Sequence, residues 1–337
     1  MARIAHVGFG YWGRNLARNF AELGVLAAVV DENRAAAEHG ASTHGVQPMS
    51  FAQVLADPTI DAVSLASPAT LHASQARKAL AAGKHVFVEK PLALDIADAE
   101  EVCRAAREGG RTLMVGHLLQ YHPVFAALRE MVQAGELGAI RYAYSNRLSL
   151  GKFRSEENVL WSFAPHDFSM VLSLFGEEPS SVTAQGNVSF LPGVADLAGA
   201  QMHFPSGGSA HVLVSWMHPF KEQRLVVIGE KASAVFEDSA PEWDRKLAIY
   251  RHGFDMSGPA PVPTKAEPDY VQVPKSEPLR NECSHFVDCI DNGRAPLTDG
   301  NEGLRVLKLL QAAEVALAEN LKRQRMRKYH ECELHGA

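Results

Sequence analysis

Residues 4–16, Ile-Ala-His-Val-Gly-Phe-Gly-Tyr-Trp-Gly-Arg-Asn-Leu, decide the fold of the first half of this chain. The apolar run over residues 4–7 predicts a short buried strand. It leads directly into a G-x-G-x-x-G pattern, and apolar residues recur at helical spacing from Leu16 onward. A pattern of this kind between a strand and a helix is typical of a turn that binds the pyrophosphate of a dinucleotide.

The three glycines of this turn have different expected roles. Gly8 permits the tight turn, Gly10 lets backbone amides approach a pyrophosphate, and Gly13 lets the helix pack close to the strand. Unpaired amides and the helix dipole then hold the anion. The same loop contributes three further expected cofactor-binding residues, which are Phe9, Tyr11 and Trp12.

An acidic residue ends the second predicted strand. Asp31 lies 18 residues after Gly13, where a carboxylate accepts hydrogen bonds from the hydroxyls of the adenosine ribose. Its charge also repels a 2′-phosphate. The sequence therefore favours NAD over NADP, and the nearby Arg34 leaves NADP open.

Strand and helix patterns alternate over about the first 135 residues, which predicts a doubly wound parallel sheet of the Rossmann type. Strand patterns then follow one another with few helices between them, which predicts a mostly antiparallel open sheet. We therefore expect an NAD-binding domain over residues 1–122 and a substrate-binding and oligomerisation domain over residues 123–337, an α/β domain followed by an α+β domain.

Within the second half, one helix is expected to interrupt the strands, over residues 165–174. Two more helices are expected near 279–291 and 302–319. The stretch 253–276 holds five prolines and few long apolar side chains. It is expected to be a surface loop.

Composition narrows the class of protein. The 337 residues are 46% apolar and 21% charged, which is ordinary for a globular chain of two domains. A net charge of −6 lacks the basic surface of a nucleic-acid binder. No apolar run approaches the ~18–20 residues that a membrane span requires. Glycine and aromatic residues come too early for a secretion signal, and four cysteines fit no disulfide or zinc framework, so we expect a cytoplasmic protein without a metal.

A lysine closes the strand predicted over residues 85–88, in the sequence Val88-Glu89-Lys90-Pro91. A side chain at the carboxyl end of a parallel strand faces the ligand crevice. With the glycine turn and the Ser67-Pro68 loop that leads to His72, this stretch resembles the Gfo/Idh/MocA oxidoreductase family over nearly the whole chain. The resemblance implies that Lys90 lies by the nicotinamide and the substrate hydroxyl. It also implies that the cofactor is lined by Ser67, Pro68, His72 and Glu89.

The second hallmark of that family is a histidine that starts the interrupting helix, ten residues before a glycine. His166 and Gly176 fit this spacing. The family often places an aspartate four residues before the histidine, where this chain has Ser162; Asp167 either substitutes for it or caps the helix. Because histidine titrates near neutral pH, His166 is favoured as the catalytic base, with Lys90 orienting and polarising the hydroxyl. The reverse assignment stays open.

Two segments, 116–123 and 144–161, resemble the branch of the family that acts on nucleotide sugars. The second segment is rich in cations that suit a diphosphate, and aromatic residues in both segments suit stacking on a sugar or the nicotinamide. The expected substrate-binding residues are Lys90, Tyr121, Asn146, Arg147, Lys152, Arg154, Trp161 and His166.

The resemblance implies NAD-dependent oxidation of the 3-hydroxyl of UDP-N-acetylglucosamine, supplying a pyridoxal-phosphate aminotransferase that makes a 3-amino sugar nucleotide for lipid A and lipopolysaccharide. The corresponding uronate, another sugar or a cyclitol stays open as the substrate. Glycoside cleavage with NAD, non-catalytic NAD sensing and aldose–aldose oxidoreduction are alternatives of other kinds. Family members cover the open sheet by pairing, so the resemblance also implies a homo-oligomer, either a dimer or a tetramer.

Overall fold

The computed structural model describes residues 1–255 and 257–335, which divide into two compact units. Unit 1 consists of residues 1–122 together with 276–308. Unit 2 consists of residues 123–275 and the chain from Leu309 onward.

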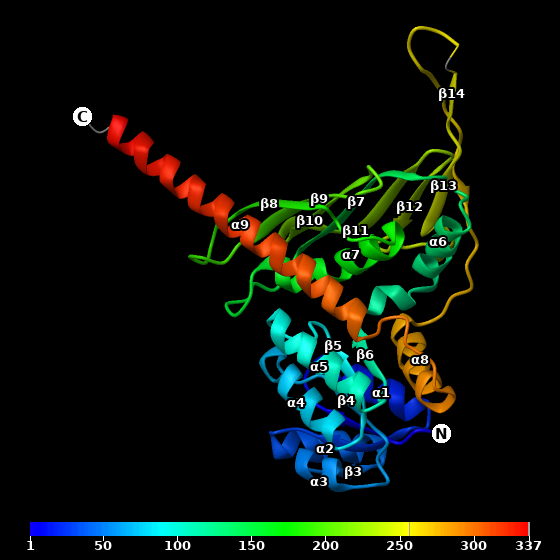
Figure 1. The fold of residues 1–337 in the computed structure, drawn as a ribbon, viewed down its shortest axis with the longest axis vertical. Coiled ribbons are helices and arrows are strands. Elements are labelled where there is room, and N and C mark those ends of the chain that lie inside the picture. The colour runs from blue at the N-terminus through cyan, green and yellow to red at the C-terminus, as the bar shows by residue number, and fades with distance from the viewer. Residues whose placement is uncertain (256, 336–337) are drawn as a thin grey trace. The chain divides into compact units, whose positions relative to one another are not determined.

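Unit 1 is built on a six-stranded parallel sheet in the order β3-β2-β1-β4-β5-β6, which confirms the predicted doubly wound sheet (Figure 1). The chain moves outward from β1 to β3 and then resumes on the other side of β1. The carboxyl ends of β1 and β4 therefore form the switch point where ligands of such sheets bind. The strands are β1 (Ile4–Val7), β2 (Leu26–Val30), β3 (Gln47–Pro48), β4 (Ala62–Leu65), β5 (His85–Glu89) and β6 (Leu113–Gly116).

Helices pack against this sheet: α1 contacts α2 and α8, and α4 contacts α5. Residues such as Ser50, whose side chain caps α3, begin these helices as their sequence predicts. The helices are α1 (Gly13–Glu22), α2 (Arg34–His44), α3 (Phe51–Ala56), α4 (Ala69–Ala81), α5 (Ile96–Glu108), the 3-10 turn η1 (Leu118–Tyr121), α8 (Pro278–Asn292) and the first part of α9 (Gly300–His335).

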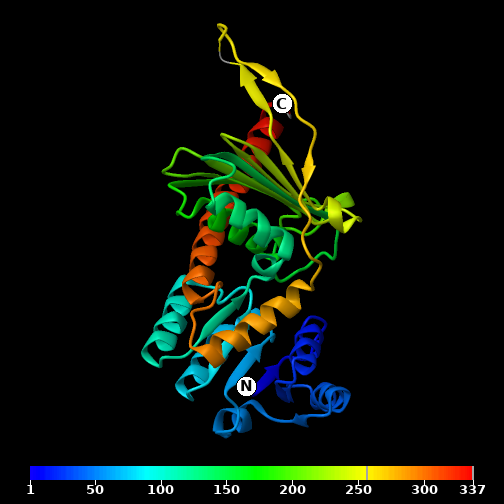
Figure 2. The ribbon, with the colours of Figure 1, turned by 90° about the vertical axis from the view of Figure 1, so that its right-hand side faces the viewer.

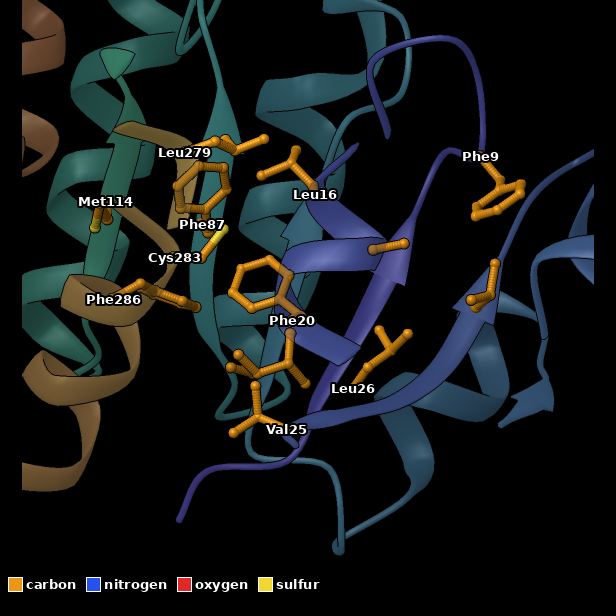
Figure 3. Close-up of a cluster of buried hydrophobic side chains, with 14 of the residues drawn as sticks. Phe9, Leu16, Phe20, Val25, Leu26, Phe87, Met114, Leu279, Cys283 and Phe286 are labelled. Atoms are coloured by element: carbon orange, nitrogen blue, oxygen red, sulfur yellow. The ribbon is translucent and has the colours of Figure 1, made fainter. Parts of the chain in front are cut away.

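The core of unit 1 explains why residues 276–308 belong to it, in contrast to the expected continuous second domain. Figure 3 shows Phe20 of α1, Phe87 of β5 and Phe286 of α8 packed together. Their ring centroids lie 5.7–6.5 Å apart, and all three side chains are fully buried. Because α8 also buries Leu279 and Cys283 in this cluster, its apolar face completes the first core rather than the second.

Unit 2 is built on an eight-stranded sheet in the order β16-β13-β12-β11-β7-β10-β9-β8. Neighbouring strands are antiparallel except for β7 and β10, which run parallel, so the predicted mostly antiparallel sheet is confirmed. The strands are β7 (Ile140–Leu150), β8 (Ser181–Asn187), β9 (Leu197–His203), β10 (Ser209–Ser215), β11 (Met217–Gly229), β12 (Ser233–Glu237), β13 (Leu247–Tyr250) and β16 (Asp269–Tyr270).

Two helices, α6 (Pro123–Gln133) and α7 (Val159–Phe175), lie against the same face of this sheet (Figure 2). The helix expected over residues 165–174 is therefore longer at its amino end. The reason is that the side chain of Asn158 accepts hydrogen bonds from the backbone N–H groups of Leu160 and Trp161 and begins the helix there.

The expected surface loop over residues 253–276 is partly ordered into strands. It forms the hairpin β14 (Gly253–Asp255) and β15 (Val262–Thr264), and it contributes β16 to the sheet edge. Pro263 is tolerated because this two-stranded hairpin has free edges, where a missing N–H removes no central hydrogen bond. Within the described residues, no helix is both long and apolar enough to span a bilayer.

Candidate active site

The glycine turn of unit 1 has the geometry of a pyrophosphate cradle. Gly8 leaves β1 with φ +97°, and a Cβ atom there would lie 2.6 Å from the backbone of Ala66, directly after β4. A Cβ atom on Gly13 would lie 1.8 Å from the carbonyl oxygen of Gly8, whereas one on Gly10 would have no atom within 4 Å. The protein's own packing thus requires two of the glycines. The third leaves open space through which a phosphate can reach the backbone.

A buried histidine that the sequence analysis missed, His6, contacts the backbone of this turn. The ring of His6 contacts the carbonyl oxygen of Gly8 through Nε2 at 3.0 Å and the hydroxyl of Ser64 through Nδ1 at 3.2 Å. Burial lowers the pKa of His6 to about 4, so the ring is neutral at pH 7. Since a carbonyl only accepts, Nε2 carries the proton. The sequence could have indicated this role, because His6 is the polar residue in an otherwise apolar strand.

Asp31 is held in place by the glycine turn itself. Its carboxylate accepts hydrogen bonds from the backbone N–H groups of Phe9 at 2.7 Å and Asn33 at 2.8 Å. A carboxylate has about four lone-pair sites, so two remain for ribose hydroxyls. Phe9, expected to line the cofactor, instead buries its ring against His39 and gives its N–H to Asp31. Its apolar ring is driven into the core, and its role is to orient Asp31.

Trp12 links the turn to the end of β5, whereas the neighbouring Tyr11 is exposed. The indole Nε1 of Trp12 donates to Oε1 of Glu89 at 2.5 Å, and the other oxygen of Glu89 accepts the backbone N–H of Lys90 at 3.3 Å. Burial raises the pKa of Glu89 to about 7, against the opposing effects of these hydrogen bonds and of the Lys90 charge. The carboxyl group therefore titrates near neutral pH beside the cofactor turn.

The side chain of His72, which was expected to line the cofactor, contacts the protein's own backbone through both ring nitrogens. Its ring is 2% exposed and lies between two backbone carbonyl oxygens, with Nδ1 2.8 Å from Pro91 and Nε2 2.8 Å from Ser67. It thereby joins the loop after β4 to the loop after β5. The Ser67 hydroxyl donates to Gln75 at 2.6 Å, and Pro68 directly precedes α4.

Lys90 follows the last residue of β5, at the same sheet edge as the glycine turn. Its charge contributes to lowering the pKa of both His72 and His117, where burial is the larger cause. Lys90 therefore interacts electrostatically with both imidazoles. The side chains and backbone that unit 1 assembles at this edge fit a dinucleotide.

In unit 2, the structure pairs two residues that the sequence analysis treated separately. The carboxylate of Asp167 accepts hydrogen bonds from Nε of Arg147 at 2.6 Å, from its Nη2 at 3.3 Å and from the Ser145 hydroxyl at 2.6 Å. Arg147 and Asp167 are both buried. Arg147 was expected to bind a diphosphate, and Asp167 to replace the family aspartate or cap the helix. Instead they form a buried ion pair, because strand β7 turns Arg147 toward α7.

His166 and Asp167 lie in the middle of α7, not at its start as expected, because the helix begins at Val159. His166 and Trp161 are half-buried on this helix, and Lys152 is exposed in the segment before it. Arg154 is exposed and pairs with Glu157 at 2.6 Å.

Two further expected substrate-binding residues have partners inside their own units. Asn146 donates to Oε1 of Glu222 at 2.8 Å. Tyr121 belongs to unit 1, where its hydroxyl contacts Oγ1 of Thr298 at 3.0 Å and its buried ring lies in the core cluster. The Tyr121 ring thus fills the apolar core of unit 1, whereas the sequence analysis expected it to stack on a sugar or the nicotinamide.

Regions that match known proteins cover most of the chain. Residues 2–117 match the oxidoreductase family with the NAD-binding Rossmann fold, and residues 125–235 match the GFO/IDH/MocA C-terminal domain. UDP-N-acetylglucosamine 3-dehydrogenase of Acidithiobacillus ferrooxidans is 33% identical over 95% of this chain and 99% of its own length. The scyllo-inositol 2-dehydrogenase (NAD(+)) of Bacillus subtilis is 27% identical over 88% of each chain.

A solved structure of the same A. ferrooxidans dehydrogenase covers 95% of this chain and 98% of its own, with a TM-score of 0.84 at 30% identity. The similarity therefore extends over both units. The chain belongs to the Gfo/Idh/MocA family of oxidoreductases, and its cofactor is NAD, because residues 2–117 match the family's NAD-binding Rossmann domain.

Proposed function

We propose that this protein oxidises the 3-hydroxyl of UDP-N-acetylglucosamine with NAD, giving the 3-keto sugar nucleotide. The observation that carries the proposal is the extent of the similarity to UDP-N-acetylglucosamine 3-dehydrogenase, which reaches 99% of that protein's length. Such similarity includes the substrate domain and is not limited to the cofactor domain, which relatives of many activities share.

The cofactor roles follow from unit 1. The backbone of the glycine turn, open at Gly10, holds the pyrophosphate, and Asp31 accepts the ribose hydroxyls. When bound, NAD supplies the acceptor for the hydride that leaves the carbinol carbon. The pKa of Glu89 is raised to about 7, so near neutral pH its carboxyl group is present in both the protonated and the ionised form.

The catalytic roles are assigned to one amine and one imidazole. Lys90 donates a hydrogen bond to the substrate oxygen and polarises it, and His166 accepts the hydroxyl proton because an imidazole is basic near pH 7. The opposite assignment, with Lys90 as the base, is the second candidate mechanism. Asp167 and Arg147 hold α7, which carries His166, against β7.

The diphosphate is assigned to the cations that the fold leaves at the surface. Lys152 is exposed, and the pair of Arg154 with Glu157 is solvent-exposed and therefore exchanges readily. Trp161 offers a half-buried indole for stacking. In this proposal Arg147 and Tyr121 have no direct substrate contact.

The product defines the next reaction. A 3-keto sugar nucleotide is the substrate of a pyridoxal-phosphate aminotransferase, which makes a 3-amino sugar nucleotide for lipid A. A second candidate substrate is a cyclitol, because inositol dehydrogenases of Bacillus subtilis and Rhizobium meliloti are 27–28% identical over most of the chain.

The test is a substrate panel. The protein is incubated with NAD and UDP-N-acetylglucosamine, its uronate, N-acetylglucosamine, myo-inositol or scyllo-inositol, and NADH is followed by absorbance. An aminotransferase with glutamate is added to remove the 3-keto product. We expect NADH with UDP-N-acetylglucosamine and loss of turnover by about 10²–10⁴-fold in Lys90→Met and His166→Asn, with NAD binding retained.

Three outcomes would overturn this proposal. NADH formed from an inositol and not from the UDP-sugar favours the cyclitol. Release of UDP or a free sugar points to glycoside cleavage, and full turnover in both variants refutes the catalytic assignment.

We also propose that the protein assembles through the open face of the unit 2 sheet, as a dimer or tetramer. That face presents Tyr142 and His211 beside a hollow of about 710 Å³, which Gln201 and Arg323 also line. Sedimentation equilibrium measures the state directly. A strictly monomeric protein at micromolar concentration contradicts the proposal.

A further inference from the structure

His117 is the residue that leaves β6 at the point where Lys90 leaves β5. The two strands are parallel neighbours with Glu89 opposite Gly116, so Lys90 and His117 follow from paired positions at the same sheet edge. Lys90 and His117 are thus the residues that directly follow the last paired positions of β5 and β6. The influence of the Lys90 charge on His117 agrees with this placement.

The imidazole of His117 is almost completely buried, at 2% exposure. Its Nε2 lies 3.5 Å from Oε2 of Glu302, near the start of α9, and the Glu302 carboxylate is 14% exposed. Within the described part of the chain, Nδ1 of His117 makes no hydrogen bond. Burying a polar nitrogen without a hydrogen bond costs free energy, so we expect Nδ1 to have a hydrogen-bond partner in the working enzyme.

Protonation states follow from these partners. A carboxylate only accepts hydrogen bonds, so Glu302 favours the tautomer with the proton on Nε2, which leaves a lone pair on Nδ1. A lysine ammonium group carries donors only. Nδ1 of His117 and the Lys90 amino group are therefore complementary. His72, the other imidazole near Lys90, places both of its nitrogens against backbone carbonyls.

We propose that His117 and Glu302 form a buried imidazole–carboxylate pair that keeps the amino group of Lys90 protonated. The pair touches neither the substrate nor the cofactor in this proposal, so His117 and Glu302 are positioning residues. The inference rests on the proposed function, in which Lys90 polarises the hydroxyl and His166 takes its proton.

The need for such a pair is electrostatic. A nicotinamide cation beside Lys90, together with burial, disfavours a second positive charge. The carboxylate of Glu302, relayed through the neutral His117, opposes that effect. Other titratable groups in this region are Glu89 on β5, His72 on α4 and the buried Glu282 on α8, which interacts electrostatically with Glu89.

The experiment measures the protonation of Lys90 directly. The cofactor-free protein is labelled with trace acetic anhydride between about pH 6 and 11, and the acetylation of Lys90 and of the exposed Lys78 is quantified by mass spectrometry. In His117→Phe and Glu302→Gln we expect the pH midpoint of Lys90 acetylation to fall by about one pKa unit. Below that midpoint, Lys90 is then acetylated about ten times faster than in the parent protein. His117→Asn, which keeps an acceptor near the position of Nδ1, is expected to retain most of the parent midpoint.

Controls separate this effect from a general structural one. Lys78 must keep its midpoint in every variant, and His85→Asn, at the opposite end of β5, must leave Lys90 unchanged. An unchanged or raised midpoint of Lys90 in both His117→Phe and Glu302→Gln overturns the proposal. If His117→Phe fails to fold, the nearly isosteric Glu302→Gln decides alone.

Because the labelling uses neither NAD nor a sugar, its result is independent of the substrate panel. If the protein does not oxidise UDP-N-acetylglucosamine but the variants shift the Lys90 midpoint, the proposed function is refuted and the His117–Glu302 pair is supported. If the protein oxidises the sugar nucleotide but the variants leave the midpoint unchanged, the function is supported and the pair is refuted.

Discussion

Replacing Asp167 by alanine is expected to destabilise unit 2 by about 3–5 kcal/mol. The magnitude follows from burial: the side chain of Asp167 is 1% exposed and that of Arg147 is 9% exposed. Three hydrogen bonds converge on the carboxylate, from Arg147 and from the Ser145 hydroxyl. Alanine removes all three and leaves a guanidinium group in the interior without its counter-charge.

Two companion variants make the reasoning specific. Replacing both partners, as Arg147→Met with Asp167→Leu, is expected to recover most of the loss, because no isolated charge remains. Arg154→Ala breaks a pair whose side chains are 49% and 27% exposed, so a loss of less than about 1 kcal/mol is expected.

Urea unfolding followed by tryptophan fluorescence is the assay. Three of the four tryptophans, Trp161, Trp216 and Trp243, belong to unit 2, and Trp216 is fully buried, so the signal reports mainly on this unit. The reasoning is refuted if the Asp167→Ala midpoint falls no further than that of Arg154→Ala. It is also refuted if the double replacement is as unstable as the single one.

Other predictions concern unit 1. Gly13→Ala is expected to lower the melting temperature, because its Cβ would lie 1.8 Å from a carbonyl oxygen. Gly10→Ala, whose Cβ has no atom within 4 Å, is expected to keep the melting temperature and to weaken NAD binding. Calorimetry measures both the melting temperature and the binding. Asp31→Ser is expected to raise the affinity for NADP relative to NAD by about tenfold or more, through loss of a repelling charge, and equilibrium binding of both cofactors tests this. Burial raises the pKa of Glu89 to about 7, above its ordinary 4.5, so its stabilising contribution is present below about pH 4.5 and is lost as the pH rises through 7. Glu89→Gln is therefore expected to be more stable than the parent by on the order of 3 kcal/mol near pH 8 and equal to it near pH 4, and equal unfolding midpoints at both pH values contradict this.

The nucleotide half of the site could be predicted because its signals are local. A strand, a glycine turn and a helix follow one another within a few residues, and a parallel sheet places the ends of β1, β4 and β5 at one edge. Asp31 could therefore be located from its position at a strand end, and Lys90 from the same rule together with the resemblance to the family. His117 satisfies the same rule at the end of β6, although the sequence analysis included it only within a segment similar to sugar-binding relatives.

The substrate half could not be predicted in the same way. Arg147, Asn146 and Arg154 look alike as polar residues near one segment, but neighbouring residues of a strand point to opposite faces. Strand β7 buries Arg147 against α7 and leaves Asn146 on the other face, with Glu222 of β11. Composition cannot distinguish a cation held by an interior carboxylate from one that is available to a ligand.

The sequence by itself determined the doubly wound first half, the open second sheet and the NAD turn, because patterns of residues close along the chain predict each of them. Only the tertiary structure decided that α8 completes the first core, that Asp167 neutralises Arg147 and that Glu302 faces His117. These contacts join residues far apart in sequence, and burial is what pairs them: a charge or a polar nitrogen taken out of water must find its partner wherever the packing of the chain provides one.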